Sequence, residues 1–496
     1  MRQTMVGLIK APSEYLTRRL KTCAFSSLRL TTVLATSLGL LLFFVLLRSQ
    51  QAQSSYVQHI FDDTIGTTGN RISLPHPYSS LPYGSDGHED QCSDRYGTGY
   101  IRRFSDSATE YCKNETGSSL TCFTHKSHDS RTDSFCVGQP AVIDASARTV
   151  GLHCPLRDWT DEDHARGAAP LSSFELYWYA TGPRTIFEQF MNFDDHNQAL
   201  LEKPETTRTV LLVKREDTVE NLWHTLMQVM SVWLSLDVLR TARDPTSGKA
   251  FSTHLDVSQI QTVILDSFED GPFWEMWSMF GGLPVVRLPD FDPASSPTQQ
   301  AVIPLPGGSN PMWQGDWIDL DCDNSALLEA FSLRILEFFE VFHKTSRWPH
   351  WNDRKTLTFI DRKKSRSLDN QDALVQAIRS RFPQVDVHLV DFAALSFKQQ
   401  LETVASTDIL VGVHGAGLTH GMFLKPNSTI VEIRPPVMDH KGFKNMAKFL
   451  GHRYFSEHSV DRDHPGKTGD WHNDRVFIEE ESLLKVIDEA IASATK

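Results

Sequence analysis

Apolar runs alternate with amphipathic stretches in the middle of the chain, a pattern typical of α/β structure. The runs Thr209–Lys214 and Thr262–Asp266 predict buried strands, and the longer stretch Glu220–Arg240 predicts a helix between them. A segment rich in Pro, Gly and Asp, Pro289–Asp323, breaks this alternation. The apolar stretch Ser325–His343 then predicts another helix.

The same alternation returns more regularly in the last third of the chain. Its apolar runs predict four further strands: Lys355–Asp361, Val385–Val390, Ile409–Val413 and Thr429–Ile433. Two stretches between them have helical periodicity: Asn370–Phe382 and Ser396–Ala405. Because helices of this length separate the strands, we expect parallel pairing with right-handed crossovers.

Two such units in tandem predict an α/β fold built from a pair of Rossmann-like domains. The N-terminal domain is expected over 91–345 and the C-terminal domain over 352–470. A ligand is expected where the carboxyl ends of strands meet the amino ends of helices. The last segment, 471–496, contains a predicted helix, Glu480–Ala492, which is expected to brace the pair.

Leu30–Leu47 is an uncharged apolar stretch of about 18 residues, which is just long enough to cross a bilayer as a helix. It predicts a transmembrane signal anchor, with 48–90 as a stem rich in Ser, Gly, Pro and Gln. The preceding segment, 1–29, is basic, so the positive-inside rule predicts a cytosolic tail and a lumenal body. The alternative interpretation is a cleaved signal peptide. The cations before the stretch, opposed by Glu14, are Arg2, Lys10, Arg18, Arg19, Lys21 and Arg29.

Cysteine usage fits a lumenal body. Of the 7 Cys, one, Cys23, precedes the apolar stretch. The others follow it: Cys92, Cys112, Cys122, Cys136, Cys154 and Cys322. This even number allows three disulfides in an oxidising compartment, with the pairing left open, and predicts a Cys-rich elaboration of the N-terminal domain. The sequons at Asn114 and Asn427 are expected glycosylation sites in such a compartment.

Composition limits the class of protein. A chain of 496 residues with 40% hydrophobic content can bury at least two substantial cores. The formal net charge of -13 argues against nucleic acid as the main partner, because phosphate binding needs a basic face. Charge alone indicates no substrate.

The most informative string is TDILVGVHGAGLTHGMFL, residues 407–424. An apolar strand runs into His414, Gly415, Ala416 and Gly417, where small residues let a turn expose its backbone N–H groups. The segment after the turn is able to begin a helix whose positive end faces an anion, which is how a diphosphate is held. The alternative interpretation is a tight packing turn.

Several strings together resemble glycosyltransferase family 61. They are HGAGLTH, the downstream PNSTIVEI (426–433), the upstream FIDRKKSR (359–366) and, in the first α/β unit, DTVENLWH (217–224). The likeness is strongest to the family's branch of EGF-domain-specific O-linked N-acetylglucosamine transferases. It covers about residues 90–455 and is strongest over 352–434.

The resemblance implies a GT-B pair of Rossmann-like domains and an inverting, metal-independent transfer without a cofactor. The implied donor is UDP-N-acetylglucosamine or UDP-xylose, and the implied acceptor is a glycoprotein or glycan. With the anchor, it predicts a single-pass type II protein of the Golgi or ER membrane. The alternative from another class is a catalytically inactive lectin-like or scaffold protein of the same fold.

Donor binding is expected at two places that match the family's pattern. Arg362 and Arg366 follow a predicted strand, and a guanidinium group can bridge two phosphate oxygens; a solvated basic loop is the alternative. His414 is expected to reach the diphosphate or sugar, or else to cap its turn. Glu432 ends the next strand, where it can accept hydrogen bonds from ribose hydroxyls or form a salt bridge to Arg434 or another neighbour.

Catalysis is expected from the N-terminal domain. Asn221 and His224 match the family's motif and lie three residues apart on one helix face, with Glu220 beside them. Gln228 stands where relatives often carry an acidic residue, so either His224 or Glu220 is the base, or activity is altered.

An acidic run near the break in the pattern imitates the Asp-x-Asp motif of GT-A enzymes. Its members are Asp316, Asp319, Asp321 and Asp323. We expect a solvated acidic loop and no metal site, and the alternative is a manganese-dependent GT-A enzyme using Asp319 and Asp321.

Overall fold

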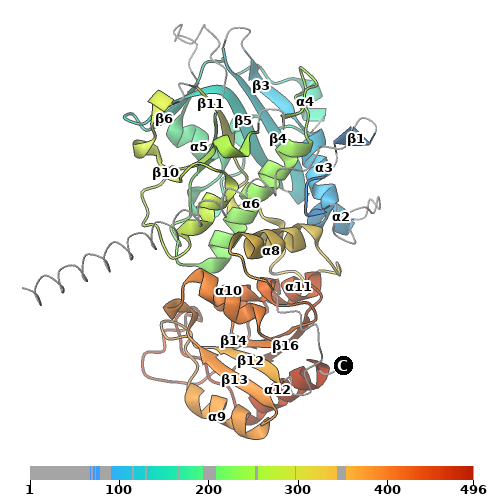
Figure 1. The fold of residues 1–496 in the computed structure, drawn as a ribbon, viewed down its shortest axis with the longest axis vertical. Helices are drawn as coiled ribbons and strands as arrows, with labels where there is room; N and C mark the ends of the chain where they lie inside the picture. Colours follow the sequence, from blue (N-terminus) through green and yellow to red (C-terminus); the bar gives the residue numbers. More distant parts are fainter. Residues whose placement is uncertain are drawn as a thin grey trace, which may run out of the picture. The chain divides into compact units, whose positions relative to one another are not determined.

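The computed structural model describes residues 67–68, 71–72, 74–78, 91–113, 117–128, 131–165, 167–193, 208–251, 255–295, 298–342 and 354–494. The predicted cytosolic tail, the predicted anchor 30–47 and most of the predicted stem lie outside these residues. None of the described helices combines the length and apolar character needed to cross a bilayer. The described part has two large sheets, each of which corresponds to one of the predicted α/β units (Figure 1).

The N-terminal sheet has nine strands, in the order β10-β9-β8-β11-β5-β4-β3, with β6 and β7 attached at β5. Its parallel part contains β10 (Val286–Arg287), β9 (Ile260–Ile264), β8 (Arg208–Val213) and β11 (Gln299–Ile303). Its antiparallel part contains β3 (Thr109–Lys113), β4 (Ser119–His128), β5 (Arg131–Asp144) and β6 (Thr149–Leu152), and β7 (Met191–Phe193) lies parallel to β6. The predicted strands β8 and β9 are present. The Cys-rich segment is an antiparallel continuation of the same sheet, which the sequence did not predict.

The C-terminal sheet is entirely parallel, with the order β13-β12-β14-β15-β16. Its strands are β12 (Lys355–Ile360), β13 (Val385–Val390), β14 (Ile409–Val413), β15 (Thr429–Arg434) and β16 (Arg453–His458). The four predicted strands and their parallel pairing are confirmed, and β16 is an addition. The order reverses between β12 and β14, so a topological switch point lies between these two strands.

Helices cover both faces of the C-terminal sheet (Figure 1). On one face lie α9 (Gln371–Arg381) and α12 (Glu480–Ala494), which bury Ile378 and Ile487 in a shared core. On the other face lie α10 (Phe397–Ala405), α11 (Gly442–Phe449) and the 3-10 segment η12 (Ala416–Phe423). The prediction that the last helix braces the two domains was wrong, because α12 packs on α9 and on strands of the C-terminal sheet.

The N-terminal unit is organised around α6 (Leu222–Thr241), which is buried over nearly its whole circumference. Beside it lies α8 (Ala326–Phe338), which ends before the predicted His343. The shorter helices are α2 (Gln91–Tyr96), α3 (Thr98–Asp106), α4 (Asp161–Ala165), α5 (Pro183–Phe190) and α7 (Pro311–Gln314). Apolar side chains of α6 and α8 form one continuous core with those of α10, α11 and η12.

Part of the predicted stem belongs to the folded body. Strands β1 (Thr67–Thr68) and β2 (Arg71–Ile72) form a small pair of their own. The Tyr78 hydroxyl donates to Asp237 at 2.9 Å, and Asp237 also pairs with Arg334 at 2.7 Å. All three side chains are buried, and burial raises the pKa of Tyr78 well above its ordinary value. The predicted stem boundary at residue 90 is therefore too late.

The six Cys that follow the predicted anchor form three disulfides: Cys92–Cys322, Cys112–Cys154 and Cys122–Cys136. The last joins directly opposed residues of β4 and β5. The first ties α2 to the acidic loop, a name used below for residues 315–323.

Candidate functional site

Two of the predicted donor-binding segments meet at the carboxyl ends of β12 and β14. Arg362 and Arg366 follow β12, and the turn that begins at His414 follows β14. These two strands are neighbours and flank the switch point of the sheet, where open α/β sheets hold their ligands. The topology therefore brings both segments to the position at which a ligand is expected.

The backbone of the turn lies directly against the two arginines. Gly415 has φ 147°, a positive angle that favours glycine. A Cβ atom added to Gly415 would lie 2.0 Å from Nη1 of Arg362 and 3.1 Å from Nη2 of Arg366. The segment after the turn begins a helix, the 3-10 segment η12.

Neither arginine has a carboxylate partner within 4.0 Å in the described part of the chain. The guanidinium group of Arg362 donates to the carbonyl and hydroxyl of Ser365, and that of Arg366 lies 5.3 Å from the ring centre of Trp471. Burial lowers the pKa of both groups, and burial together with the charge of Arg362 lowers the pKa of Arg366 to about 10. Two partly buried like charges at one place are stabilised by an anion bound between them.

His414 and Glu432 form a buried pair beside this turn. Nδ1 of His414 lies 2.5 Å from one carboxylate oxygen of Glu432, and the hydroxyl of Tyr454 donates to the other. Burial lowers the pKa of His414, although Glu432 opposes the change. Of the alternative partners expected for Glu432, the neighbour that pairs with it is His414, whereas Arg434 pairs with Asp439. Tyr454 lies on the unpredicted strand β16, so the sequence did not indicate it.

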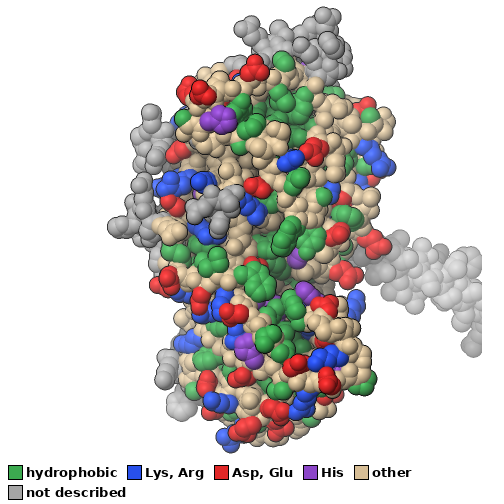
Figure 2. Space-filling model, turned by 180° about the vertical axis from the view of Figure 1, so that it is seen from behind, with side chains coloured by type: hydrophobic (Ala, Val, Ile, Leu, Met, Phe, Trp, Pro, Cys, Tyr) green, Lys and Arg blue, Asp and Glu red, His purple; other side chains and the backbone are tan. Residues whose placement is uncertain are grey.

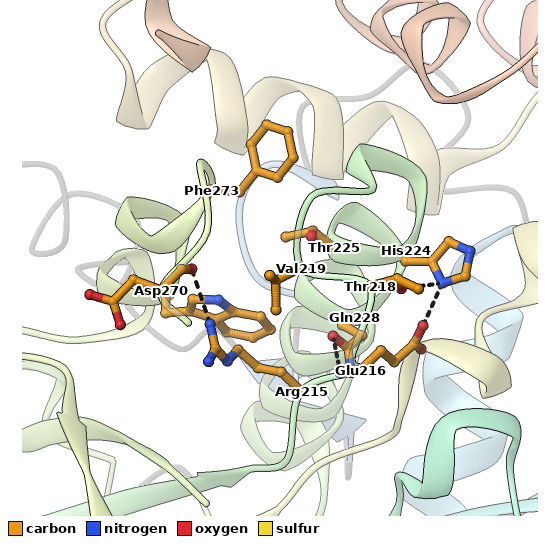
Figure 3. A pocket seen from close by; sticks show the side chains of 10 residues that line it. Arg215, Glu216, Thr218, Val219, His224, Thr225, Gln228, Asp270 and Phe273 are labelled. Carbon is orange, nitrogen blue, oxygen red and sulfur yellow. Dashed lines mark hydrogen bonds and ion pairs between the residues drawn. The ribbon is translucent and has the colours of Figure 1, made fainter. Parts of the chain in front are cut away.

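A small pocket lies beside the start of α6 (Figure 3). Its lining residues are Arg215, Glu216, Thr218, Val219, His224, Thr225, Gln228, Asp270, Phe273 and Trp277. Of the predicted catalytic residues, His224 lines it, whereas the predicted donor-binding residues do not.

His224 is held by a carboxylate that sequence reasoning missed. Its Nδ1 lies 2.6 Å from Oε2 of Glu216 and 2.9 Å from the hydroxyl of Thr218. Glu216 is 2% exposed, and this burial raises its pKa, although the hydrogen bond with His224 opposes the change. With Nδ1 engaged, Nε2 is the ring nitrogen available to a substrate hydroxyl.

The other two predicted catalytic residues lie apart from this pair. Glu220 is exposed and lies 3.7 Å from Lys364 of the basic loop after β12. Asn221 caps α6, and its side chain accepts a hydrogen bond from the backbone N–H of Trp223. Glu220 thus has a surface ion pair, and Asn221 has a capping role.

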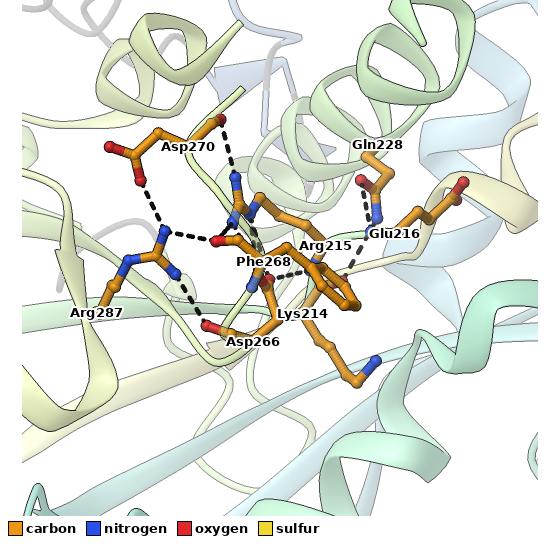
Figure 4. A network of polar contacts seen from close by, with 8 residues as sticks. All are labelled: Lys214, Arg215, Glu216, Gln228, Asp266, Phe268, Asp270 and Arg287. Carbon is orange, nitrogen blue, oxygen red and sulfur yellow. Dashed lines mark hydrogen bonds and ion pairs between the residues drawn. The ribbon is translucent and has the colours of Figure 1, made fainter. Parts of the chain in front are cut away.

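Gln228 braces the loop that carries Glu216 (Figure 4). It accepts from the backbone N–H of Glu216 at 3.3 Å and donates to the carbonyl of Lys214 at 3.4 Å. The same loop is fixed by the buried pair of Arg215 and Asp266, 2.8 Å apart. The amide at position 228 therefore has a positioning role that does not require it to be a base.

Aromatic contacts connect the two candidate parts. Trp223, next to His224, lies 6.0 Å from the ring of Phe443, and Phe443 lies 5.3 Å from His414. The ring of His224 itself lies 4.5 Å from that of Trp313. These contacts link the start of α6, which carries Trp223 and His224, to the turn that begins at His414.

The acidic loop is engaged with α11. Asp319 and Asp323 pair with Lys444 and Lys448 at 2.5 and 3.2 Å, and Asp316 lies 3.3 Å from His440. The backbone of the loop is also bound by Asn445, whose side chain donates to the carbonyls of Gly315 and Ile318. In the described part of the chain, no group of three or more His, Cys, Asp or Glu side chains is arranged to hold a metal ion.

The two sequons differ in what the structure describes. Asn114 lies outside the described residues. Asn427 is exposed in the turn before β15, and its carbonyl accepts a hydrogen bond from Arg453 at 2.9 Å.

Fold and site together define an α/β protein with two partly buried arginines at a topological switch point and a His–Glu pair in a pocket beside α6. Residues 222–431 match the model of glycosyltransferase family 61, so this segment is similar to that family. The resemblance expected from the sequence is confirmed. It extends to the family's EGF-domain-specific branch, because the curated relatives carry that description.

One relative is the EGF domain-specific O-linked N-acetylglucosamine transferase of Drosophila melanogaster, 28% identical over 287 residues, which are 57% of this chain and 52% of the relative. The protein of the same description from Canis lupus familiaris is 24% identical over 312 residues, 62% of this chain and 54% of the relative. The protein from Gallus gallus is 24% identical over 374 residues, which are 72% of this chain and 65% of the relative. The chain thus spans about half to two thirds of the length of these relatives.

Among solved structures, a mutant flavo di-iron protein from Thermotoga maritima aligns with 78% of this chain and 99% of its own. Its TM-score of 0.21 and identity of 8% are too low to indicate a shared fold.

Proposed function

We propose that the protein is a glycosyltransferase that moves N-acetylglucosamine or xylose from a UDP-sugar, with inversion, to a hydroxyl of a glycoprotein or glycan. The observation that carries this proposal is the pair of half-buried arginines against the Gly415 turn, without a carboxylate partner among the described residues. A diphosphate supplies the missing negative charge and fits the fork of two guanidinium groups. The family match supports the same reaction class.

In this proposal Arg362 and Arg366 hold the diphosphate and stabilise the charge that develops on UDP as it leaves. They provide two positive charges at the leaving group, so we propose a transfer that does not depend on a metal ion. The backbone N–H groups of the Gly415 turn supply further donors.

His224 is proposed as the general base. Its Nε2 takes the proton of the acceptor hydroxyl while that oxygen attacks the anomeric carbon of the sugar. UDP leaves from the opposite face, which inverts the configuration. Glu216 holds the ring through Nδ1 and stabilises the positive charge that forms on it. Glu220 is not required in this scheme.

The compartment is part of the proposal. The predicted anchor and basic tail suit a type II membrane protein of the Golgi or ER, and three disulfides suit its lumen. We propose that Asn114 and Asn427 are glycosylated there. Because the relatives are named for specificity toward EGF domains, a folded EGF-like domain is the first acceptor to test.

Calorimetry on the full-length chain in detergent tests the proposal. UDP, UDP-N-acetylglucosamine and UDP-xylose are titrated with and without EDTA, and we expect binding of UDP and one preferred sugar donor, unaffected by EDTA. Arg362→Ala is expected to weaken UDP binding about 100-fold, because it removes a bidentate charge-assisted contact of about 3 kcal/mol.

Arg354→Ala is the matched control. Arg354 precedes β12, at the opposite end of the strand, where it pairs with Asp386 on the surface. This variant is expected to bind UDP like the wild type. Equal UDP affinity of the Arg362 variant and the wild type would rule out diphosphate binding by Arg362. If the wild type binds none of the three nucleotides, the catalytically inactive scaffold is favoured.

A further inference from the structure

The segment Leu176–Gly182 forms a rigid loop that is anchored by Tyr177. The ring of Tyr177 is 8% exposed, and its hydroxyl donates to the buried carboxylate of Asp133 at 2.5 Å. The guanidinium group of Arg131 lies 4.6 Å from the ring centre. A Cβ atom on Gly182 would lie 2.8 Å from Tyr177, so the close approach requires glycine there.

The next residues adopt a costly backbone conformation. Tyr179 and Ala180 have φ angles of 66° and 48°, in the left-handed region that residues with a Cβ atom rarely occupy. Each such residue costs about 1–2 kcal/mol. Strain of this kind persists where surrounding contacts fix it, and it clusters at functional sites. Here the strained turn places Tyr179 against the ring of His224 and leaves its neighbour Trp178 exposed to solvent.

One result of this turn is that Tyr179 lies on the proposed base. Its ring is 5.0 Å from that of His224, with the planes at 75°. Burial and the charges of Glu216 and Asp217 raise the pKa of Tyr179, in keeping with a phenol near the carboxylate of the His–Glu pair. The loop is therefore a wall of the site to which the acceptor hydroxyl must come.

The other result is an exposed apolar ridge, which we define as Leu176 and Trp178. Leu176 is 58% exposed and Trp178 is 81% exposed, the highest value among the described aromatic side chains that reach the surface. Single apolar side chains at the surface are ordinary, and several lie among charged ones on the face shown in Figure 2. Two large ones, presented by a strained and anchored loop beside a proposed base, are unusual.

We infer that Leu176 and Trp178 dock the polypeptide part of the acceptor, so that its hydroxyl reaches His224. This inference rests on the proposed function and extends it to acceptor recognition. The occupant follows from position, because Tyr179 of the same loop packs against the ring of His224, to which the acceptor hydroxyl must come.

The chemistry of the ridge favours a protein surface over a sugar. A leucine and an exposed tryptophan match the apolar anchors of protein interfaces, in which a few such side chains carry most of the binding energy. A glycan needs several hydrogen-bonding groups, and the ridge offers a single one, the indole N–H of Trp178. The expected ligand is therefore a folded domain that carries the acceptor hydroxyl next to an apolar patch.

The test separates acceptor docking from donor chemistry. With full-length protein, we measure the KM for the folded EGF-like domain, the rate of UDP-sugar hydrolysis without acceptor, and UDP affinity. Trp178→Ala is expected to raise the KM at least tenfold and Leu176→Ala severalfold, with hydrolysis and UDP affinity unchanged. Phe342→Ala, which removes another exposed aromatic ring, 73% exposed and located after α8, is the matched control.

Each outcome bears on one proposal. A KM within twofold of the wild type for both ridge variants would overturn the docking assignment while leaving the transferase proposal intact. If the wild type neither binds UDP nor transfers sugar, the proposed function fails, and direct binding of the same folded domain still decides the ridge. Weaker binding by Trp178→Ala supports docking, whereas equal binding by the variant, or no binding by the wild type, rejects it.

Discussion

Gly415→Ala is the sharpest perturbation of the proposed donor site. The new Cβ atom would lie 2.0 Å from Nη1 of Arg362, far inside the distance of about 3.4 Å at which such atoms normally meet. The methyl group displaces the guanidinium group of Arg362 by more than an ångström. The Gly415 turn cannot move instead, because moving it away from β14 would break the pairing of β14 with β15. A charged hydrogen bond contributes about 1.5–3 kcal/mol, so loss of two from one arginine costs about 3–6 kcal/mol.

This cost corresponds to UDP binding that is weaker by about 100-fold or more, measured by calorimetry at constant salt. The substitution also adds strain at a positive φ of 147°, which lowers stability by about 1–2 kcal/mol. Thermal unfolding followed in parallel separates the two effects.

Gly451→Ala controls for backbone strain. Gly451 has φ 66°, and a Cβ atom there would meet nothing within 4 Å, so the substitution has the conformational cost without the collision. We expect a comparable loss of stability and unchanged UDP affinity. The reasoning is refuted if Gly415→Ala binds UDP within threefold of the wild type, or if both variants lose affinity equally.

Two further predictions concern buried titratable groups. Glu216→Gln is expected to lower kcat for transfer about 100-fold or more, measured by steady-state kinetics, without changing UDP affinity, because the amide cannot stabilise the positive charge that forms on His224. His420 is buried between the Gly417 carbonyl and Gln400, and burial lowers its pKa from 6.5 to about 4. The neutral form of His420 therefore contributes its full stabilisation above about pH 6.5, and up to about 3 kcal/mol of the free energy of unfolding is lost as the pH falls to about 4. Denaturant unfolding of His420→Gln should not show this loss.

The central strands of the C-terminal sheet were predictable because β14 and β15 are buried on both faces. Such strands appear in the sequence as unbroken apolar runs, and the predicted Ile409–Val413 coincides with β14. The prediction missed β16, because the half-buried string Arg453–His458 is mostly polar and forms the edge of the sheet.

The N-terminal sheet was harder to predict because half of it is antiparallel. Strand β11 lies inside the Pro- and Gly-rich segment that was expected to be irregular, yet all its residues are buried between β8 and β5. Its string, Gln299–Ile303, gains strand character from its neighbours in space rather than from its own composition. The disulfide pairing likewise depended on strand register that no spacing reveals.

The site residues likewise divide into those that the sequence predicted and one that it did not. The family motif located His224 and the arginines, but Glu216 precedes that motif as one of several acids after β8. Its single signal was its position just past a buried strand. Nothing in the sequence fixes the 2.6 Å contact with His224, because that contact requires α6 to turn back over the loop.

The continuous core between the two sheets has a consequence for how this architecture can change. Leu401, Met422 and Phe443 of the C-terminal half bury their side chains in the same cluster as α6 and α8, and Ser332 of α8 donates to the Met422 carbonyl. A fragment that contained only residues 354–494 would present this face to water. The C-terminal half therefore behaves as one side of an obligate interface. Exchange of that half between relatives would require the face of α6 and α8 that packs against it to be exchanged as well.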